Sequence, residues 1–464
     1  MCGSRRCRGR TVLVVSDSEV TARLLEVEQL VLNRAPENDV EPSLEAIAAL
    51  MDLMGNPQRA FPVVHITGTN GKTSTARMVE RLLRELGLRT GRFTSPHLVD
   101  VRERIAFDGE PVDAVRFVAA WDDVAPYLAM VDESARAAGE PLINYFQVLT
   151  AMAFAAFADA PVDVAVVEVG LGGRWDSTNV ADGQVAVITP VGIDHERLLG
   201  YTVDAIAAEK AGIIKAGAIA VIAAQLPGAA EVIYERVAEV GARLVLEGQQ
   251  FGVLRRAVAV GGQVVSIKGI GGDYDNLFLP LHGAHQAHNL ACAIAAVESF
   301  FGGGEQPLDI DVVREAVAGM DSPGRLEVVR TSPTVVIDAA HNPSGATVVA
   351  EAVGEAFSFR RLVGVVAVLR DKDAAGILEA LEPVLDEVVL TRTTSPRAAD
   401  PDELAAVARD LFGEDRVHVA RHLPDALDLA VTLAEQEGEV GAGVLVTGSV
   451  TLAAEVRTLM GARS

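Results

Sequence analysis

The stretch TGTNGKTS, residues 67–74, joins a run of valine and isoleucine residues to a helical pattern. Gly68 and Gly71 allow the backbone to curl closely around phosphate oxygens, so that amide groups and the helix N-terminus face the anion. Lys72 brings a flexible positive charge to the β- and γ-phosphates of a nucleotide. These residue types predict a nucleotide-binding loop, and the alternative is an ordinary glycine turn that caps a helix.

Two hydroxyl residues, Thr73 and Ser74, follow the lysine. Their oxygens could bind a magnesium ion at the nucleotide phosphates. The standard phosphate loop begins with a glycine at the position that Ile66 occupies here. The glycine spacing is therefore shortened. The apolar strand before the loop and the helix after it still favour nucleotide binding over a simple turn.

Titratable residues end two later apolar runs. The stretch VVEVGLGGRWDSTN, residues 166–179, places Glu168 at the end of a valine run. A carboxylate that has left water there needs a cation or several hydrogen-bond donors. The stretch ITPVGIDHERLLG, residues 188–200, ends a second run with Asp194 and His195. A capping acid in a surface loop and a structural histidine are the alternatives, because a lone histidine is more often structural than a metal ligand.

Together these stretches resemble the Mur ligase superfamily, which joins amino acids to carboxylates with ATP. Within it, the chain is most similar to the folylpolyglutamate synthase/dihydrofolate synthase family. The family's motifs occur in the expected order, namely GTNGKT, FTSPHL, EVGLGGRWDSTN, GIDH, EKAGI, HQAHN, SPGR and DAAHNPSG.

The resemblance implies a metal role for several side chains. Ser95 of FTSPHL, Glu168 and His195 would be magnesium ligands. Lys210 of AAEKAGIIK would be carbamylated, and the new carboxylate would hold a second magnesium ion. Carbamylation needs a neutral amine, so burial must lower the pKa of the lysine; the alternative is a surface lysine paired with Glu209. Magnesium prefers oxygen ligands, so the role of His195 depends on the family.

The implied nucleotide contacts come from the loop, a later helix, the linker and the second domain: Thr69, Asn70, Gly71, Lys72, Thr73, Ser74, Asn289, Arg325 and Asp338. Without the resemblance, Asn289 is equally compatible with a helix cap. Arg325 reaches a phosphate only if two domains close over the nucleotide, which would exclude water from a reactive intermediate. The implied catalytic residues are Lys72, Lys210 and His341.

The implied pterin contacts are Asn144, Tyr145, Phe146, Gln147, Trp175, Asp176 and Ser177. The aromatic pair Tyr145 and Phe146 suits a pterin ring. The family commonly has glutamate at the position of Gln147, which leaves open how the pterin is held. LRDKD, residues 369–373, and LVTGSVTLAAEVR, residues 445–457, also match family positions, although the charges of RDKD alone are typical of a solvated loop.

Apolar runs alternate with Ala/Leu/Glu-rich helical stretches, which is typical of α/β proteins with parallel sheets. We predict a large P-loop ATPase-type domain with a mostly parallel sheet at residues 21–320, a linker at 321–331 and a smaller Rossmann-like domain at 332–464. Residues 1–20 would be a disordered N-terminal extension. The glycine-rich residues 244–280 would form an antiparallel patch.

The net charge of −24 argues against nucleic-acid binding, which needs a basic surface. No apolar run approaches the roughly 20 residues that span a bilayer. Three cysteines, Cys2, Cys7 and Cys292, form neither a disulfide framework nor a metal cluster, so we expect a reducing, cytoplasmic compartment. An anionic substrate would need basic residues at its binding site to offset the repulsion from the chain's net negative charge. We expect a monomer.

The resemblance implies a reaction in which a substrate carboxylate attacks the γ-phosphate of ATP and the amine of L-glutamate then attacks the acyl phosphate. The acceptors would be dihydropteroate and reduced folates, and the cofactors would be ATP and two magnesium ions. One alternative is a synthase that only extends folates. A second is a peptidoglycan-precursor ligase, which usually carries an extra N-terminal domain before its phosphate loop. A third is a nucleotide-binding switch, which would not need EVGLGGRWDSTN, GIDH and EKAGI together.

Overall fold

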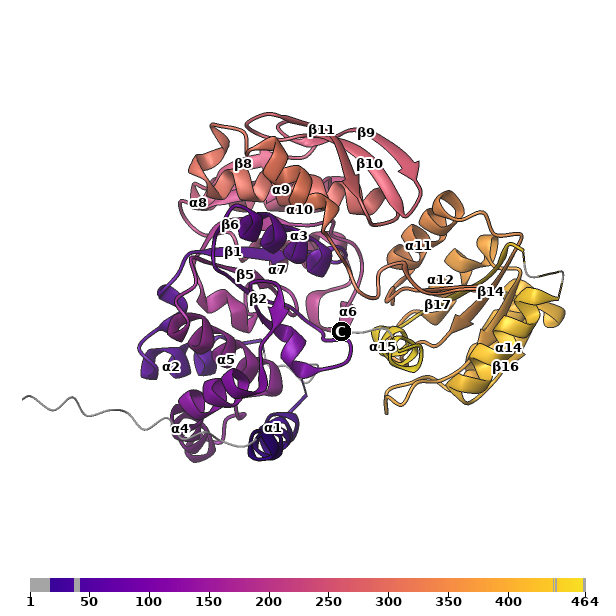
Figure 1. Ribbon diagram of the computed structural model, residues 1–464. Coiled ribbons are helices and arrows are strands. Elements are labelled where there is room, and N and C mark those ends of the chain that lie inside the picture. Colours follow the sequence, from indigo (N-terminus) through magenta and orange to yellow (C-terminus); the bar gives the residue numbers. More distant parts are fainter. Residues whose placement is uncertain (1–16, 37–41, 437, 439, 462–464) are drawn as a thin grey trace, which may run out of the picture.

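The computed structural model describes residues 17–36, 42–436, 438 and 440–461. The chain folds into two α/β units that stand side by side, the larger built from the N-terminal part and the smaller from the C-terminal part (Figure 1). The predicted fold class is confirmed, because each unit is built around a mostly parallel sheet with helices on both faces. Within the described ranges, no helix is long and apolar enough to cross a membrane.

The sheet of the large unit has eight strands in the order β4-β3-β2-β5-β1-β6-β7-β8. Its strands are β1 (Val63–Thr67), β2 (Thr90–Phe93), β3 (Ile105–Phe107), β4 (Glu110–Pro111), β5 (Val164–Glu168), β6 (Gly183–Ile188), β7 (Ile219–Ile222) and β8 (Arg243–Leu246). Only the pairings of β3, with β2 on one side and β4 on the other, are antiparallel. The sequence prediction did not include these two short edge strands.

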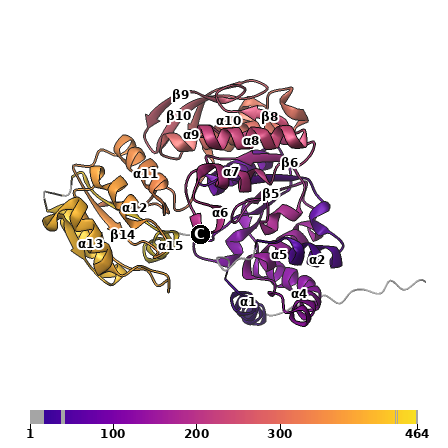
Figure 2. The same cartoon turned by 180° about the vertical axis from the view of Figure 1, so that it is seen from behind.

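Helices cover both faces of this sheet, as seen from opposite sides in Figures 1 and 2. They are α1 (Asp17–Leu32), α2 (Glu45–Leu53), α3 (Lys72–Glu85), α4 (Ala114–Ala138), α5 (Tyr145–Asp159), α6 (Glu196–Leu199), α7 (Val203–Ala211), α8 (Pro227–Val240), α9 (Ala284–Phe300) and α10 (Ile310–Ala318). Side chains alternate between the faces of a strand: Val64 and Ile66 pack with α3 and α9, whereas Val63 packs with the layer of α4 and α5. Burial on both faces explains the near-continuous apolar runs in the sequence.

The glycine-rich segment forms a separate antiparallel sheet of β9 (Gly252–Ala259), β10 (Gly262–Lys268) and β11 (Asp273–Leu279). The prediction placed the start of this patch at residue 244. That boundary is wrong, because β8 pairs in parallel with β7 and extends the main sheet.

The smaller unit has a six-stranded sheet in the order β12-β13-β17-β14-β15-β16, and only β12 is antiparallel to its neighbour. The strands are β12 (Glu327–Thr331), β13 (Thr334–Ile337), β14 (Arg361–Val366), β15 (Glu387–Leu390), β16 (Val417–Val419) and β17 (Ala442–Thr447). The helices are α11 (Pro343–Ala356), α12 (Ala374–Leu381), α13 (Pro401–Phe412), α14 (Leu423–Glu435) and α15 (Val450–Leu459).

Two predicted boundaries need correction. Residues 327–331 form β12 and pair with β13, so the second half of the predicted linker belongs to the smaller sheet. Helix α1 begins at Asp17, inside the predicted N-terminal extension, and it packs against α4 through Val27 and Val31. Residues 1–16, with Cys2 and Cys7, lie outside the described residues. Cys292 is buried in α9 with a free thiol, and burial raises its pKa.

The strand order decides where a site can form. Strand β1 lies between β5 and β6, and β2 lies on the far side of β5. All four strands are parallel, so their carboxyl ends meet at one edge of the sheet. The loops that follow them carry TGTNGKTS, FTSPHL, EVGLGG and TPVGIDH. Ligands of open α/β sheets bind at this kind of edge.

Candidate active site

The phosphate loop lies between β1 and α3 with its two glycines pressed against neighbouring side chains. Gly71 has a φ of +86°, and a Cβ there would stand 2.6 Å from Oδ1 of Asn289. Gly68 approaches Thr189 even more closely. Asn289 is buried in α9 and donates to Gln286 over 3.2 Å. The predicted loop residue Gly71 and the predicted nucleotide residue Asn289 are therefore in direct contact across the core.

Gly71→Ala should weaken ATP binding by at least tenfold, because the alanine must adopt a left-handed conformation and displace Asn289. The left-handed strain costs about 1–3 kcal/mol of folding stability. Gly87→Ala is a matched control, since Gly87 has the same φ of +86° and open space around it. Calorimetric titration with ATP and thermal unfolding of both variants measure the two effects. Equal ATP affinity in the two variants would contradict the contact-based explanation.

Glu168 is a buried carboxylate among the loops that follow β1, β2 and β5. Its carboxylate accepts a hydrogen bond from Oγ1 of Thr73 at 2.9 Å and another from the amide of Ser95 at 3.3 Å. The side chain is 1% exposed, and burial raises its pKa to about 7. Ser74 faces the other way and lies 2.9 Å from Ser322 at the start of the linker. Thr73 is thus the loop hydroxyl that contacts the carboxylate.

Glu168 and Thr73 offer oxygen ligands at the end of the phosphate loop, which suits a magnesium ion that also binds phosphates and water, and the amide of Ser95 donates to the same carboxylate. In the part of the chain that the structure describes, no three His, Cys, Asp or Glu side chains are grouped to form a metal cage. A cation at Glu168 would therefore depend on the nucleotide phosphates for its remaining ligands.

Two lysines lie beside the loop. Lys72 folds back so that Nζ donates to the carbonyls of Gly68 and Thr69, each at 3.2 Å. Lys210, in the last turn of α7, donates from Nζ to the carbonyl of Gly68 at 2.8 Å. Lys210 is 4% exposed, and burial lowers its pKa to about 7, with the charge of Lys72 acting in the same direction. The alternative of a surface lysine paired with Glu209 is wrong, because Lys210 points inward to the loop.

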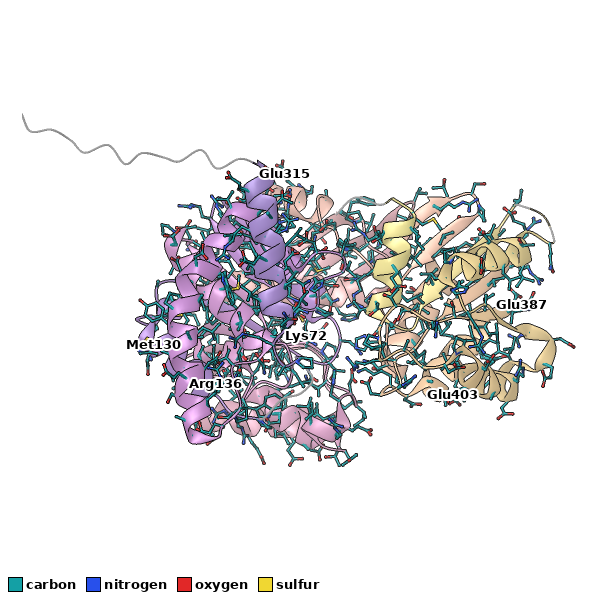
Figure 3. All side chains as sticks on the ribbon, turned by 90° about the horizontal axis from the view of Figure 1, so that it is seen from below. Lys72, Met130, Arg136, Glu315, Glu387 and Glu403 are labelled. Carbon is teal, nitrogen blue, oxygen red and sulfur yellow. The ribbon has the colours of Figure 1, made fainter. Side chains whose placement is uncertain are left out.

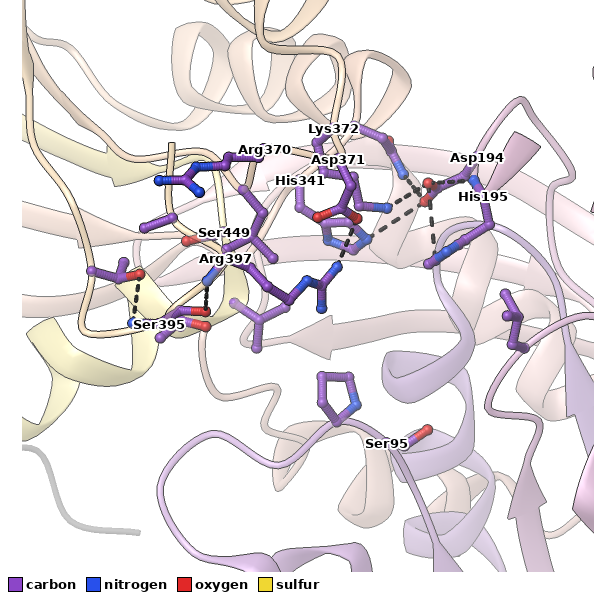
Figure 4. A pocket seen from close by; sticks show the side chains of 18 of the residues that line it. Ser95, Asp194, His195, His341, Arg370, Asp371, Lys372, Ser395, Arg397 and Ser449 are labelled. Atoms are coloured by element: carbon purple, nitrogen blue, oxygen red, sulfur yellow. Dashed lines mark hydrogen bonds and ion pairs between the residues drawn. The ribbon is translucent and has the colours of Figure 1, made fainter. Parts of the chain in front are cut away.

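Asp194 joins the two units (Figure 4). Its carboxylate lies 2.5 Å from Nζ of Lys372 and 3.6 Å from Nε2 of His341, and it accepts from Nδ2 of Asn342 at 3.0 Å. Burial alone would raise the pKa of Asp194, but the hydrogen bond from His341 and the nearby positive charges lower it well below its usual range. His195 lies beside Asp194, and burial lowers its pKa to about 4.

The RDKD loop is not simply a solvated loop, because the side chain of Lys372 is only 8% exposed in its ion pair with Asp194. The sequence signal for this contact was the family match of LRDKD alone. Residues of the phosphate loop also reach the smaller unit: Nδ2 of Asn70 donates to Oγ of Ser344 at 2.8 Å. Lys72 therefore lies on the side of the large unit that faces the smaller one (Figure 3).

Asp338 and Arg325 lie where the linker meets β13. The carboxylate of Asp338 accepts from the amides of Leu326 and Ala340 at 2.9 and 2.7 Å, which fixes the linker to the end of the strand. Asp338 is 3% exposed, and burial raises its pKa while Arg325 opposes that shift. The charge of Arg325 also acts on Glu168 and Lys72. Arg325 is therefore near both the phosphate loop and the smaller unit.

Six of the seven predicted pterin residues line the large-unit wall of the cleft. Asn144 and Gln147 form a capping box at the start of α5, in which Oε1 of Gln147 accepts from the amide of Asn144 at 2.8 Å. A glutamate would accept the same bond, so the glutamine keeps the local fold and leaves an amide donor in place of a charge. Phe146 packs against Gly170 and Phe93.

Trp175 and Asp176 follow β5 on the same wall. Asp176 is buried and accepts from the amides of Leu171 and Thr178, each at 2.9 Å, so it holds the glycine loop in shape. The ring of Trp175 is half-buried at the mouth of this loop. Tyr145 is turned into the core with the guanidinium of Arg104 over its ring, and it does not line the cleft.

One cleft of about 2430 Å³ lies between the two units. The predicted site residues that line it are Lys72, Ser95, Asn144, Phe146, Gln147, Trp175, Asp176, Ser177, His195 and His341. The remaining predicted residues do not line this cleft, namely Thr69, Asn70, Gly71, Thr73, Ser74, Glu168, Lys210, Asn289, Arg325, Asp338 and Tyr145. The cleft therefore brings six of the predicted pterin residues, on the large unit, together with His341 of the smaller unit.

A shortened phosphate loop with a buried glutamate and a buried lysine, facing a second α/β unit, defines an ATP-dependent ligase of the Mur type. Family models agree: the Mur ligase middle domain matches residues 132–297, and the Mur ligase glutamate ligase domain matches residues 324–450. A dihydrofolate synthase/folylpolyglutamate synthase of Mycobacterium tuberculosis is 51% identical, over 98% of this chain and 97% of that protein. The dihydrofolate synthase/folylpolyglutamate synthase of Escherichia coli is 31% identical, over 91% of this chain and 92% of that protein.

A solved structure gives the same result. The folylpolyglutamate synthase of Mycobacterium tuberculosis, complexed with ADP and AMPPCP, superposes with a TM-score of 0.91 at 51% identity, over 96% of this chain and 99% of that one. The chain belongs to the dihydrofolate synthase/folylpolyglutamate synthase family of Mur ligases. The resemblance inferred from the motifs is therefore confirmed.

Proposed function

We propose that this protein joins L-glutamate to dihydropteroate, giving dihydrofolate, and to reduced folates, giving folylpolyglutamates. The acceptor carboxylate attacks the γ-phosphate of ATP, ADP leaves, and the glutamate amine then displaces phosphate from the acyl phosphate. The observation that supports this most is the cleft. Lys72 of the phosphate loop and His341 of the smaller unit line it together with Phe146 and Trp175, which are predicted pterin contacts.

The residues around the loop divide the chemistry. Lys72 neutralises charge that develops on the transferred phosphoryl group. Glu168 and Thr73 would hold a magnesium ion, which supplies further charge neutralisation when bound. Ser95 and His195 are the other proposed ligands. His341 has Nδ1 3.1 Å from the carbonyl of Ala339, which leaves Nε2 directed to Asp194 and the cleft. We propose that His341 orients the incoming amino acid.

The closed contacts between the units support a water-free reaction chamber. Asp194 and Asn70 on the large unit contact Lys372, Asn342 and Ser344 on the smaller one. These contacts would exclude water from an acyl phosphate, which water would otherwise hydrolyse. We further propose a cytoplasmic compartment, because the free thiol of Cys292 fits a reducing environment. We also propose that the protein is a monomer.

Lys210 should carry a carbamate when bicarbonate is present, because its buried amine is neutral above pH of about 7 and can attack carbon dioxide. With ¹³C-bicarbonate at pH 8, carbon NMR should show one protein carbamate signal that Lys210→Ala removes and that fades below pH 6. Lys215→Ala is the control, since Lys215 is also part-buried with a lowered pKa but donates to Asn179 away from the loop. A signal that survives Lys210→Ala would contradict the assignment.

The proposed function is tested by phosphate release from Mg-ATP and L-glutamate, with dihydropteroate and tetrahydrofolate offered separately. Release with both acceptors, and none without glutamate, is the expected result. Release with tetrahydrofolate alone would leave a chain-extending synthase and would point to Gln147 as the lost contact for dihydropteroate. Release that needs neither acceptor nor glutamate would indicate a nucleotide switch.

A further inference from the structure

The wall of the cleft that belongs to the smaller unit carries five cationic side chains and four carboxylates, although the whole chain is strongly acidic. Four arginines line it together with Lys372: Arg370, Arg392, Arg397 and Arg421. A local cluster of cations, in a chain with a net charge of −24, is suited to an anionic ligand wherever its members are not already paired with carboxylates.

The sheet order arranges these arginines in a row. Strands β13, β17, β14, β15 and β16 are parallel neighbours in that sequence, so their following loops emerge side by side at intervals of roughly 4.8 Å. The loop after β13 carries His341. Arg370 follows β14, Arg392 and Arg397 follow β15, and Arg421 follows β16. The row therefore begins near the catalytic end of the cleft and leads away from it.

Every acidic side chain on this wall already has another partner. Asp371 pairs with Arg397 at 2.6 Å, Asp400 lies 3.6 Å from Arg421, and Asp373 caps α12 through the amide of Gly376. Glu455 accepts from the amide and the hydroxyl of Thr394 at 2.8 and 2.6 Å.

Arg370 and Arg392 remain as the cations without a partner. Both side chains are exposed, and within the described part of the chain neither forms an ion pair or a side-chain hydrogen bond. The amide of Arg370 donates to the carbonyl of Arg397 at 2.9 Å, which ties the two loops together. Figure 4 shows Arg370 pointing away from the Asp194 cluster, on the same wall as Arg397 and Ser449. Their charges are therefore available to a ligand.

We propose that this arginine row, with Arg370 and Arg392 as its free members, binds the α-carboxylates of the polyglutamate tail of the acceptor. The inference depends on the proposed function. Each γ-linked glutamate leaves one free α-carboxylate, so the tail is a chain of regularly placed anions, and guanidinium groups pair well with carboxylates. The cleft is also larger than the roughly 300–1,000 Å³ of an ordinary ligand pocket, which leaves space for a tail beside ATP.

Dihydropteroate provides an internal control, because its single carboxylate is the group that is activated and it has no tail. The test compares wild-type protein with the double variant Arg370→Gln/Arg392→Gln on dihydropteroate and on tetrahydrofolate with one and with three glutamates. Arg59→Gln/Arg136→Gln is the matched control, since both residues are exposed, lie outside the cleft and give the same change in net charge.

We expect the KM for the triglutamate to rise about tenfold in the cleft variant, which corresponds to two exposed charge-assisted contacts. The KM for dihydropteroate should stay within twofold, and the products from tetrahydrofolate should end at shorter chains. Two results would overturn the inference: an equal rise of the KM for dihydropteroate, or a KM for the triglutamate no higher than in the control variant. Either result leaves the proposed function intact as long as the wild-type protein is active. Wild-type protein that extends no acceptor would refute the proposed function itself.

Discussion

Glu168→Gln should reduce turnover by at least about 10³-fold, the largest loss that we expect from any one substitution. The carboxylate accepts hydrogen bonds from Oγ1 of Thr73 at 2.9 Å and from the amide of Ser95 at 3.3 Å, so it lies beside the Thr73 hydroxyl that would hold a magnesium ion with it and the phosphates. Glutamine keeps the volume and one acceptor oxygen but removes the charge. Phosphate release over a range of magnesium concentrations measures the loss.

The same substitution should stabilise the metal-free protein above pH 7. The pKa of Glu168 rises from 4.5 in the unfolded chain to about 7 in the folded one because of burial. Between these values the folded state holds more protons, so wild-type stability falls as pH rises through the window. Above pH 7 the buried carboxylate is ionised, which lowers the free energy of unfolding by about 3 kcal/mol. Glutamine cannot ionise, so the variant does not lose this stability.

Thermal unfolding without magnesium at pH 5 and at pH 8 therefore separates the two effects of Glu168→Gln. The variant should gain stability over wild type only at pH 8, although its activity is lost. Glu231→Gln is the control, because Glu231 is exposed on α8 outside the cleft and should change neither quantity strongly. Near-normal turnover in Glu168→Gln would falsify the metal-ligand assignment.

Lys72→Met should lower kcat by about 10²–10³-fold while ATP binding changes much less. Nζ of Lys72 is held by the carbonyls of Gly68 and Thr69 in the nucleotide-free loop. Burial lowers the pKa of Lys72, and Glu168 opposes that shift, which indicates a desolvated charge close to the acid. A charge in this position acts most strongly when negative charge develops in the transition state.

Single-turnover phosphate release and ATP titration distinguish the two parameters for Lys72→Met. Lys72→Arg should recover little activity, because a planar fork does not replace a compact ammonium group in a tight loop. Lys268→Met is the control, since Lys268 is exposed on the antiparallel sheet. A variant that binds ATP much more weakly but turns over normally at saturation would show that Lys72 acts in binding alone.

Much of the fold could be predicted because buried parallel strands leave a strong signal. The runs around Val64, Val166 and Val187 are apolar on both faces, and each of them became a central strand. Weak signals failed at the edges. Strand β12 reads EVVRT and is half-exposed, so its sequence does not distinguish it from a linker. The sheet to which β8 belongs depends on its pairing with β7, and local sequence does not specify that partner.

By itself, the sequence predicted candidate residues for the chemistry: local pattern indicated the glycines of TGTNGKTS and Glu168 after its valine run, and the family resemblance indicated Lys210 within AAEKAGIIK. The first two features are local, because glycine's backbone freedom and the end of an apolar run can be read from a short segment. The tertiary structure alone decided how the distant segments meet. It placed Lys372 against Asp194 and set the arginines of three separate loops in one row, because strand order and domain contact, rather than chain order, determine which charges become neighbours.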